Sequence, residues 1–434
     1  MGDRPKRPES TLLYSPNSQM SISLLSSEAE SPNYRGFLNL GAIILFVTNF
    51  RLIIENIVKY GFLLHIPSWN EVIFLYASWP CLFCTLLLSV PLSICFAIEH
   101  FLGAKLPQVL VTLLQSLNIL VTLAVPPGLI KYSDAHFVPA FFLLLYTLVA
   151  AMKEYSFYDV MKEVRVSFHS EEYQKYPKEL KEVIAKYPNI TSFRHFVYFV
   201  FTPTLCFQFK YPRTERVRKV WLFKRICEFV LSLSVAALII QQYIEPLILN
   251  TLQLLHTEEI NYVLVLERHL KLAVPSLYLW LLLFFNCFQC YTNIMAELTT
   301  FGDRTFYLEW WNARTLGEYW RLWNIPVHSW LFRHIYIPIV AKGFNKNFSI
   351  FVTFAISAVA HEYIFSSALK IVSCWAFTGM MLQIPMIILG DLFKNQLQKS
   401  QLGNVIFWVT FCIVGQPAAI LVYWYQVVFN LSLL

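Results

Sequence analysis

The stretch "NFSIFVTFAISAVAHEYIFSSAL", residues 347–369, is long and apolar enough to cross a membrane as a helix. At 1.5 Å per residue it spans about 34 Å, against about 30 Å for the hydrocarbon core of a bilayer. It nevertheless contains two ionisable side chains in succession, His361 and Glu362. Because a charged group at mid-membrane costs about 2.5 kcal/mol or more, both side chains are expected to face a cavity or a polar partner.

Apolar runs of similar length recur along the chain. Of its 434 residues, 57% are hydrophobic and only 14% are charged, which excludes an ordinary soluble globule. The composition therefore predicts an all-α, polytopic membrane protein with nine transmembrane helices. The predicted spans are residues 37–63, 71–99, 108–130, 136–152, 226–250, 272–298, 347–369, 372–393 and 403–428.

Residues 1–33 are rich in serine, proline and charge and lack apolar periodicity, so we expect a disordered cytosolic tail before a transmembrane catalytic domain, 34–434. If the tail is cytosolic, nine spans also place loops 153–225, 299–346 and 394–402 in the cytosol. These are the basic loops, as the positive-inside rule requires. The net charge of +7 is thus interpreted as orientation information and does not imply nucleic-acid binding.

Three local patterns carry narrower expectations. The segment 196–209 is apolar but short and contains a proline, so we expect it to be interfacial or re-entrant. Arg51 and Glu55, four residues apart in the first span, are expected to pair with each other or with a neighbouring helix. "CLFC" at 81–84 and "CFQC" at 287–290 have a spacing known from zinc and redox motifs, yet both lie inside spans without a second pair. We interpret them as buried small side chains and expect no metal.

Single polar residues near His361 indicate a polar cavity. Ser357 lies one turn before His361 on the same helix face, whereas Glu362 points about 100° away and needs a polar contact on an adjacent helix. The next two spans carry Gln383 and Gln416. Hydrogen bonding between helices is the structural alternative for each glutamine, and a neutral imidazole held between helices is the alternative to catalysis or proton transfer by His361.

The segment "FYLEWWNARTLGEYWRLWNIPVHSWLFRHIYIPIV", residues 306–340, interleaves aromatic rings with basic and polar side chains, and we call it the aromatic segment. On a helix, Asn324 and His328 share a face because they are four residues apart. A basic, aromatic surface beside an intramembrane histidine suits a ligand with an anionic head and an apolar tail, such as acyl-CoA. Interfacial aromatics on a surface helix are the alternative interpretation.

"FYLEWWN", residues 306–312, resembles the FYxDWWN signature of the sterol and diacylglycerol branch of the membrane-bound O-acyltransferases, and "HEY", residues 361–363, resembles their active-site histidine region. "NIPVHSWLFRHIYIP", "WAFTGMMLQIP" and "GQPAAILVY" are similar to the acyl-CoA:diacylglycerol acyltransferase subgroup, and the likeness runs from about residue 33 to the end. Glu309 departs from the signature, which has aspartate at that position. We expect this extra methylene to alter local packing without loss of function.

The resemblance implies an endoplasmic-reticulum membrane enzyme that transfers a fatty acyl group from acyl-CoA to the free hydroxyl of diacylglycerol. It implies that His361 acts as general base, with Asn324, Glu362 and Gln416 at the reaction centre. It also implies contacts along the acyl-CoA path from Trp323, His328, Tyr336, Lys346, Ser357 and Gln383. No cofactor is implied beyond the acyl-CoA substrate, and the family's assembly is a homodimer or homotetramer.

Two alternatives remain open on the sequence. A related enzyme would acylate a sterol, a long-chain alcohol or retinol, since the choice of acceptor depends on cavity shape. A protein of another class, a proton-coupled transporter or channel, would use His361 as a proton relay. The transporter alternative offers no reason for the aromatic segment.

Overall fold

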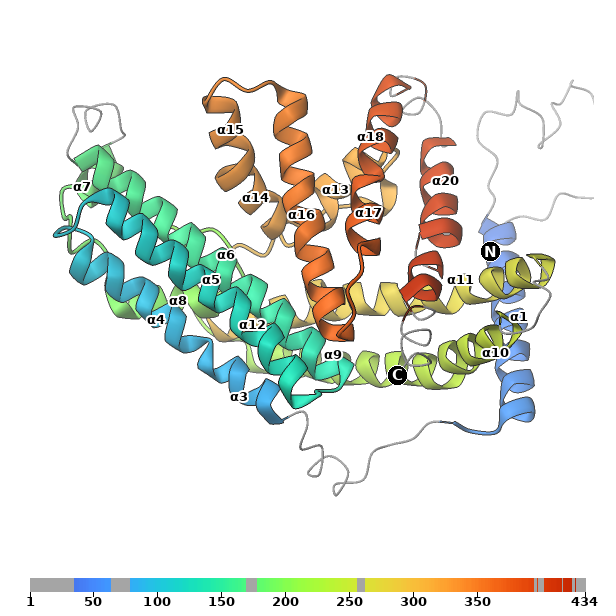
Figure 1. Ribbon diagram of the computed structural model, residues 1–434. Helices are drawn as coiled ribbons and strands as arrows, with labels where there is room; N and C mark the ends of the chain where they lie inside the picture. The colour runs from blue at the N-terminus through green and yellow to red at the C-terminus, as the bar shows by residue number, and fades with distance from the viewer. Residues whose placement is uncertain are drawn as a thin grey trace, which may run out of the picture. The chain divides into compact units, whose positions relative to one another are not determined.

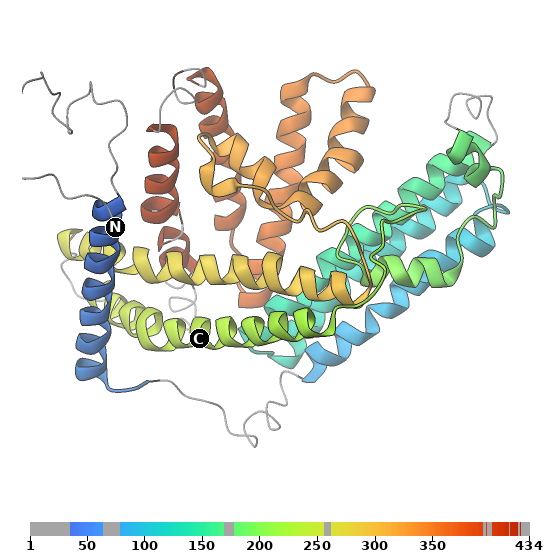
Figure 2. The ribbon, with the colours of Figure 1, turned by 180° about the vertical axis from the view of Figure 1, so that it is seen from behind.

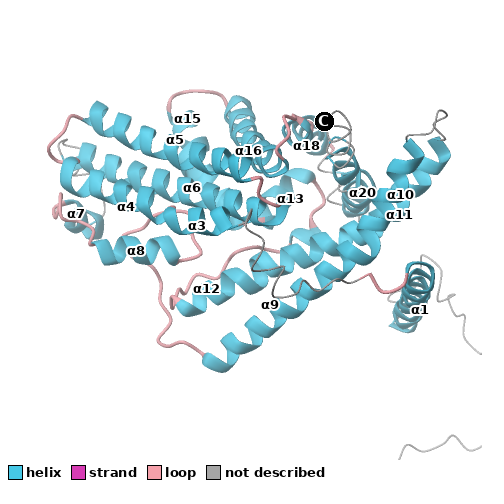
Figure 3. Cartoon of the chain, turned by 60° about the horizontal axis from the view of Figure 1, so that its bottom comes forward, coloured by secondary structure: helices cyan, strands magenta, loops and turns pink. Residues whose placement is uncertain are grey.

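The computed structural model describes residues 35–63, 79–168, 178–255, 262–393, 396, 402–415, 417–423 and 426. Helices account for most of these ranges, and their one β contact is an isolated bridge between Arg213 and Phe301. Figure 3 shows the helices and the loops that join them. The all-α prediction is therefore confirmed, while the predicted tail, 1–33, lies outside the described residues.

Within the described ranges, six helical stretches are long and apolar enough to cross a membrane, so the predicted count of nine is not confirmed. The predicted span 372–393 is divided at Leu382 into α17 (Trp375–Met381) and α18 (Gln383–Leu392). The six stretches are Trp79–Leu102, Gln108–Ser133, Phe137–Phe168, Val263–Leu298, Lys346–Leu369 and Leu402–Tyr423.

Helix α1 (Arg35–Tyr60) belongs to a separate compact unit, Met1–Leu63. Most of its described apolar side chains are exposed, as on a helix surrounded by lipid. Arg51 and Glu55 form an ion pair at 3.4 Å along its surface. The expected pairing within this helix is thus confirmed.

The second unit, Leu64–Leu434, begins with α3 (Trp79–Leu87), α4 (Ser89–Ala97), η3 (Ile98–Leu102), α5 (Gln108–Ser133) and α6 (Phe137–Phe168). Figure 1 shows α5 and α6 side by side, with α3 and α4 along them. Helix α6 runs to Phe168 and so continues past residue 152, the predicted end of this span. The sequence after residue 152 contains several polar residues. Lys153, Glu154 and Arg165 are nevertheless buried against neighbouring elements, and these contacts stabilise the continuation of α6.

The short helices α7 (Lys178–Ile184) and α8 (Phe193–Phe201) follow α6. The buried Lys153 ammonium donates to the carbonyl oxygens of Phe199, Val200 and Thr202 at 2.7–2.8 Å, which satisfies the C-terminal carbonyls of α8. Residues 196–209 therefore end a short helix and then form a loop held against α6. Their expected interfacial or re-entrant placement concerns the membrane boundary and stays a prediction.

Two long helical rods form the next layer. One is α9 (Lys219–Ile239), η5 (Ile240–Ile244) and α10 (Glu245–Leu255); the other is α11 (Tyr262–Phe284), η6 (Phe285–Tyr291) and α12 (Thr292–Leu298). Figure 2 shows them running side by side in lime and yellow. Glu297 at the end of α12 accepts hydrogen bonds from Arg218 at 2.8 Å and Arg304 at 2.5 Å, which holds the start of α9 beside the loop that follows α12.

The C-terminal half carries most of the predicted site residues. It comprises η7 (Trp310–Asn312), α13 (Leu316–Trp323), α14 (Ile325–Leu331), η8 (Phe332–Tyr336), α15 (Ile337–Ala341), α16 (Lys346–Leu369), α17, α18, α20 (Leu402–Val409) and η9 (Thr410–Gly415). In Figure 1, α16 stands between the α14–α15 arm and the α17–α18 arm. It also packs against α6. Helix α16 thus brings His361 to the junction of several elements.

Candidate active site

The half-buried imidazole of His361 is fixed by its own helix. Its Nδ1 lies 2.8 Å from the backbone carbonyl oxygen of Ser357, one turn earlier on α16. Because a carbonyl oxygen only accepts hydrogen bonds, Nδ1 carries the proton. In the neutral ring, Nε2 is then the unprotonated nitrogen. Among the described residues Nε2 has no hydrogen-bond partner, so its lone pair is available to a substrate proton.

The carboxylate of Glu362 is fully engaged and does not contact His361 in the described part of the chain. It joins α16 to the start of α17 and to the C-terminal helical residues 417–423. Its donors are Ser366 Oγ, Ser373 Oγ at 2.6 Å, the backbone N–H of Phe377 at 3.0 Å and the Tyr423 hydroxyl at 3.5 Å. Glu362 therefore braces three elements around His361, and its role in the reaction centre stays a prediction.

Asn324 lies at a break between α13 and α14, with φ −140° and ψ 84°. Its Oδ1 accepts the backbone N–H of Val327 at 3.2 Å, so Asn324 is the N-cap of α14. Asn324 thus interrupts the helix between α13 and α14, while the backbone N–H of His328, one turn later, still donates to the Asn324 carbonyl oxygen at 2.9 Å. Its Nδ2 donates to no described residue, which leaves one donor group for a ligand.

Trp323 is not part of an open aromatic surface. Its ring stacks on Trp280 with centroids 5.0 Å apart and packs against Phe284 and Phe288 at 5.5 and 5.1 Å. These partners come from α11 and η6. Trp323 thus anchors the end of α13, directly before Asn324, to the long helical rods.

Gln383 joins α18 to α13. Its Oε1 accepts a hydrogen bond from Trp320 Nε1 at 2.6 Å, and the Trp320 ring meets Phe354 of α16 edge-on at 6.4 Å. Gln383 therefore makes a hydrogen bond between helices, and its expected place on the acyl-CoA path stays a prediction. Gln416 lies outside the described residues.

Two other predicted residues, His328 and Tyr336, lie on one face of α14–η8 with Phe332 between them. The rings of His328, Phe332 and Tyr336 stack in turn, with centroids 6.3 and 5.4 Å apart. Burial lowers the pKa of His328, and the nearby Arg321 cation lowers it further, which favours the neutral ring. Lys346 is the exposed first residue of α16. The neutral ring and the exposed ammonium are compatible with an apolar chain and an anionic headgroup, respectively.

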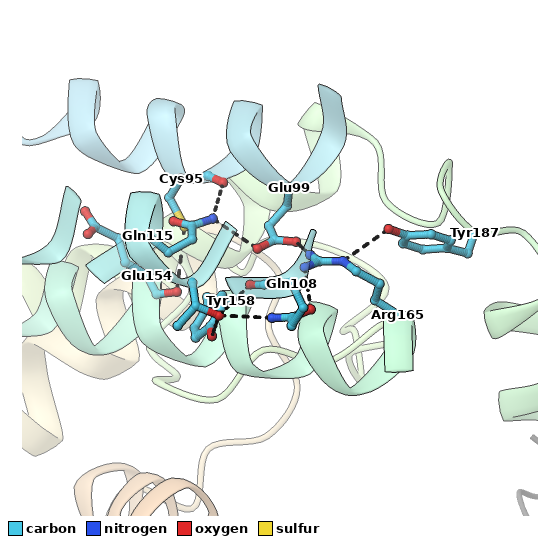
Figure 4. Close-up of polar contacts among 9 residues, drawn as sticks. Cys95, Glu99, Gln108, Gln115, Glu154, Tyr158, Arg165 and Tyr187 are labelled. Atoms are coloured by element: carbon cyan, nitrogen blue, oxygen red, sulfur yellow. Dashed lines mark hydrogen bonds and ion pairs between the residues drawn. The ribbon is translucent and has the colours of Figure 1, made fainter. Parts of the chain in front are cut away.

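A buried polar network between α4 and α6, drawn in Figure 4, was not predicted from the sequence. The Glu99 carboxylate accepts hydrogen bonds from the Arg165 guanidinium and from Gln115 Nε2 at 3.1 Å. Arg165 also donates to Gln108 Oε1 at 2.7 Å and to the Tyr187 hydroxyl at 3.2 Å. All of these except Gln108 are buried. We call this set the Glu99–Arg165 network.

A second acid continues the network toward the middle of α5. The fully buried Glu154 accepts hydrogen bonds from Asn118 Nδ2 at 3.3 Å and Thr122 Oγ1 at 3.1 Å. The signal in the sequence was the polar row on α5, which repeats every three or four residues at Gln108, Thr112, Gln115, Asn118 and Thr122. The network joins α4, η3, α5 and α6.

The cysteines and acids of the described ranges provide no group of three metal-ligating side chains. Cys81, Cys84, Cys287 and Cys290 are free thiols, and all but Cys287 are buried. Of the predicted reaction-centre residues described, His361 Nε2 and Asn324 Nδ2 are polar groups with no described hydrogen-bond partner.

Comparison with known proteins places these features in a wider group. The model of the membrane-bound O-acyltransferase family matches residues 127–424. Diacylglycerol O-acyltransferase 1C of Glycine max is 37% identical over 396 residues, which cover 91% of this chain and 75% of the relative. Diacylglycerol O-acyltransferase 1 of Corylus americana is 37% identical over 93% of this chain and 74% of the relative. Diacylglycerol O-acyltransferase 1 of Arabidopsis thaliana is 34% identical over 93% and 75%, respectively.

Proposed function

The chain belongs to the membrane-bound O-acyltransferase family, and on that premise we propose that it transfers a fatty acyl group from acyl-CoA to the free hydroxyl of diacylglycerol. The product is triacylglycerol. The similarity to diacylglycerol O-acyltransferases over more than nine-tenths of the chain supports the choice of substrates. The observation on which the mechanism depends is the open Nε2 of His361, in a ring whose Nδ1 proton is held by Ser357.

In the proposed reaction, His361 Nε2 accepts the proton of the diacylglycerol hydroxyl while that oxygen attacks the thioester carbonyl carbon. The carbon–sulfur bond then breaks, and the CoA thiolate takes the proton from the imidazolium. The proton is thus returned within one turnover, and no acyl-enzyme is needed when both substrates are bound together beside His361. Burial of the reacting groups also keeps water away from the activated carbonyl.

A hydrogen-bond donor is needed to stabilise the negative charge that develops on the carbonyl oxygen. Asn324 Nδ2 suits this role because its Oδ1 is already used as the cap of α14. Gln416 is the alternative donor proposed from the family resemblance. Glu362 is proposed to act at the reaction centre by holding α16 against α17.

Access follows from the chemistry of the two substrates. CoA is too polar for hydrocarbon, so we place its entry on the cytosolic side, with Lys346, His328 and Tyr336 along the path. Trp323, Ser357 and Gln383 are proposed to support that path. Diacylglycerol would enter laterally from the bilayer. A multi-pass location in the endoplasmic-reticulum membrane, a cytosolic N-terminus and a homodimer or homotetramer complete the proposal.

The test is acyl transfer by purified protein in lipid. Labelled oleoyl-CoA and diacylglycerol are incubated with it, and the neutral lipids are separated. Labelled triacylglycerol supports the proposal. Preferential labelling of cholesterol, a long-chain alcohol or retinol, offered as competing acceptors, would assign another lipid alcohol. Proton flux in vesicles without any acyl transfer would favour the transporter alternative.

A further inference from the structure

Both ring nitrogens of the buried His334, in η8, are hydrogen-bonded to side chains of α6, and the proposed reaction does not use them. We call this arrangement the His334 bracket. Its Nδ1 is 2.8 Å from Asp159 Oδ2, and its Nε2 is 2.9 Å from Ser156 Oγ. Asp159 and Ser156 are three residues apart on α6 and so lie on one face of that helix. His334 is only 2% exposed as a residue, and Ser156 is fully buried.

The order Ser–His–Asp resembles a hydrolytic triad, but Ser156 cannot serve as its nucleophile. Its Oγ accepts the backbone N–H of Phe207 at 2.8 Å and is closed off from any ligand. The Ser156 proton is then donated to His334 Nε2, and the Nδ1 proton of His334 is donated to Asp159. Every polar group is matched in this arrangement, which is the property of a brace.

Neighbouring side chains on the same face of α14–η8 also fix this segment against α6 and the loop that follows α8. Trp330 Nε1 donates to the carbonyl oxygen of Met152 at 2.8 Å, and Arg333 donates to the carbonyl oxygen of Phe207 at 3.1 Å. The residues of the opposite face are His328, Phe332 and Tyr336, whose rings stack on one another. Phe332 and Tyr336 are each two residues from His334, and residues two apart on a helix point to nearly opposite sides, so fixing His334 sets the direction of that stack.

We propose that His334, held by Asp159 and Ser156, is a positioning residue for acyl-CoA binding. The bracket sets the rotation and height of α14–η8 on α6. It thereby presents His328 and Tyr336 to the acyl-CoA path and places the Asn324 cap at the start of α14. This inference rests on the proposed function for the identity of the ligand.

Graded substitutions at His334 separate its two bonds. His334→Asn keeps an amide near the position of Nδ1, His334→Gln keeps one near Nε2, and His334→Phe keeps the ring shape without either bond. One net hydrogen bond corresponds to a factor of about 2–10 in an equilibrium constant. The KM for oleoyl-CoA should rise by about 2–5-fold in the two amide variants and by about 10-fold or more in His334→Phe. The exposed His136, substituted by Phe, is the matched control and should leave this KM unchanged.

The comparison of KM with kcat separates positioning from general instability. A brace that only stabilises the fold would lower the fraction of active enzyme, hence kcat, and leave the KM for oleoyl-CoA unchanged. The KM for diacylglycerol, measured on the same preparations, is the internal reference and should change by less than about twofold. Asp159→Asn can still accept the Nδ1 proton and should keep the wild-type KM, whereas Asp159→Ala should behave as His334→Gln does.

Equilibrium retention of radiolabelled oleoyl-CoA by the purified full chain gives a result that does not depend on turnover. Weaker retention by His334→Phe than by wild type and His136→Phe supports the proposal, even if no triacylglycerol is formed. If wild type makes no triacylglycerol, the proposed function fails on its own. Equal oleoyl-CoA retention and equal KM in folded His334→Phe, His334→Asn and wild type would overturn the positioning role.

Discussion

The Glu99–Arg165 network and His361 are both polar groups inside apolar helices, yet their pairing differs. In the network, the Glu99 carboxylate and the Arg165 guanidinium are bonded to groups on neighbouring elements. At His361, one ring nitrogen is bonded to its own helix and the other meets no described partner. Burying a polar group costs free energy unless the group is hydrogen-bonded. A ring nitrogen without a partner at such a position is therefore expected to serve a function. In the proposed mechanism, the paired groups stabilise the fold and the open nitrogen of His361 accepts the substrate proton.

Glu362 directly follows His361, yet its carboxylate is hydrogen-bonded to neighbouring elements, as the side chains of the Glu99–Arg165 network are. Its carboxylate accepts bonds from two serines, a tyrosine and the start of α17. Neighbours in sequence therefore differ in role according to whether their hydrogen-bonding capacity is used. The following predictions test this division, from the largest expected effect to the smallest.

The largest effect is expected for His361→Ala. Removal of a general base should lower turnover by about 10²- to 10⁴-fold. The melting temperature in detergent should stay near that of wild type, because the one described bond of the ring is to a carbonyl of its own helix. Both are measured on one preparation. Transfer at more than about a tenth of the wild-type rate would exclude His361 as the base. A parallel fall in melting temperature would make it a brace.

Arg165→Met should produce the opposite pattern. It leaves the Glu99 carboxylate buried without its cation, a change that typically costs about 3–5 kcal/mol of stability. The melting temperature should fall clearly, while turnover per folded molecule should remain near wild type. The double variant Glu99→Gln/Arg165→Met removes the stranded charge and should recover part of the loss. A stable Arg165→Met protein that has lost its turnover would contradict the division.

Asn324 combines both roles, and two substitutions separate them. Asn324→Ala removes the cap of α14 and should cost about 1 kcal/mol of stability, whereas Asn324→Ser retains a capping oxygen and should restore it. If Nδ2 donates to the oxyanion, Asn324→Ser should still be slower by about 10²-fold. Restoration of both stability and turnover by serine would leave Asn324 as a cap alone.

The smallest effect is expected for Trp320→Phe, which removes the indole donor to Gln383 and keeps an aromatic ring against Phe354. Loss of one hydrogen bond should lower stability by about 1 kcal/mol, read as a shift in melting temperature. Turnover should change by less than about twofold. A larger loss of turnover without a change in melting would place Gln383 at the reacting groups.

Much of this arrangement was predictable from single residues, and the rest depends on how helices meet. Placing an ionisable residue within an apolar membrane span costs free energy, so such a residue indicates a functional site. His361 can be recognised in the sequence for this reason. The Glu99–Arg165 network does not stand out, because Arg165 looks like part of a loop until α6 is seen to continue to Phe168. The cap at Asn324 was missed for a related reason. A four-residue spacing suggests one helix, although Pro326 in the first turn of α14 indicates a new start.

The most direct test of the account is the release of free CoA thiol by purified protein mixed with oleoyl-CoA, with and without diacylglycerol. Direct transfer through the open nitrogen of His361 predicts that thiol appears in step with triacylglycerol, only when diacylglycerol is present, and hardly at all in His361→Ala. A stoichiometric burst of thiol from wild type without diacylglycerol would show an acyl-enzyme and contradict the assignment of His361 as a base acting on the acceptor hydroxyl.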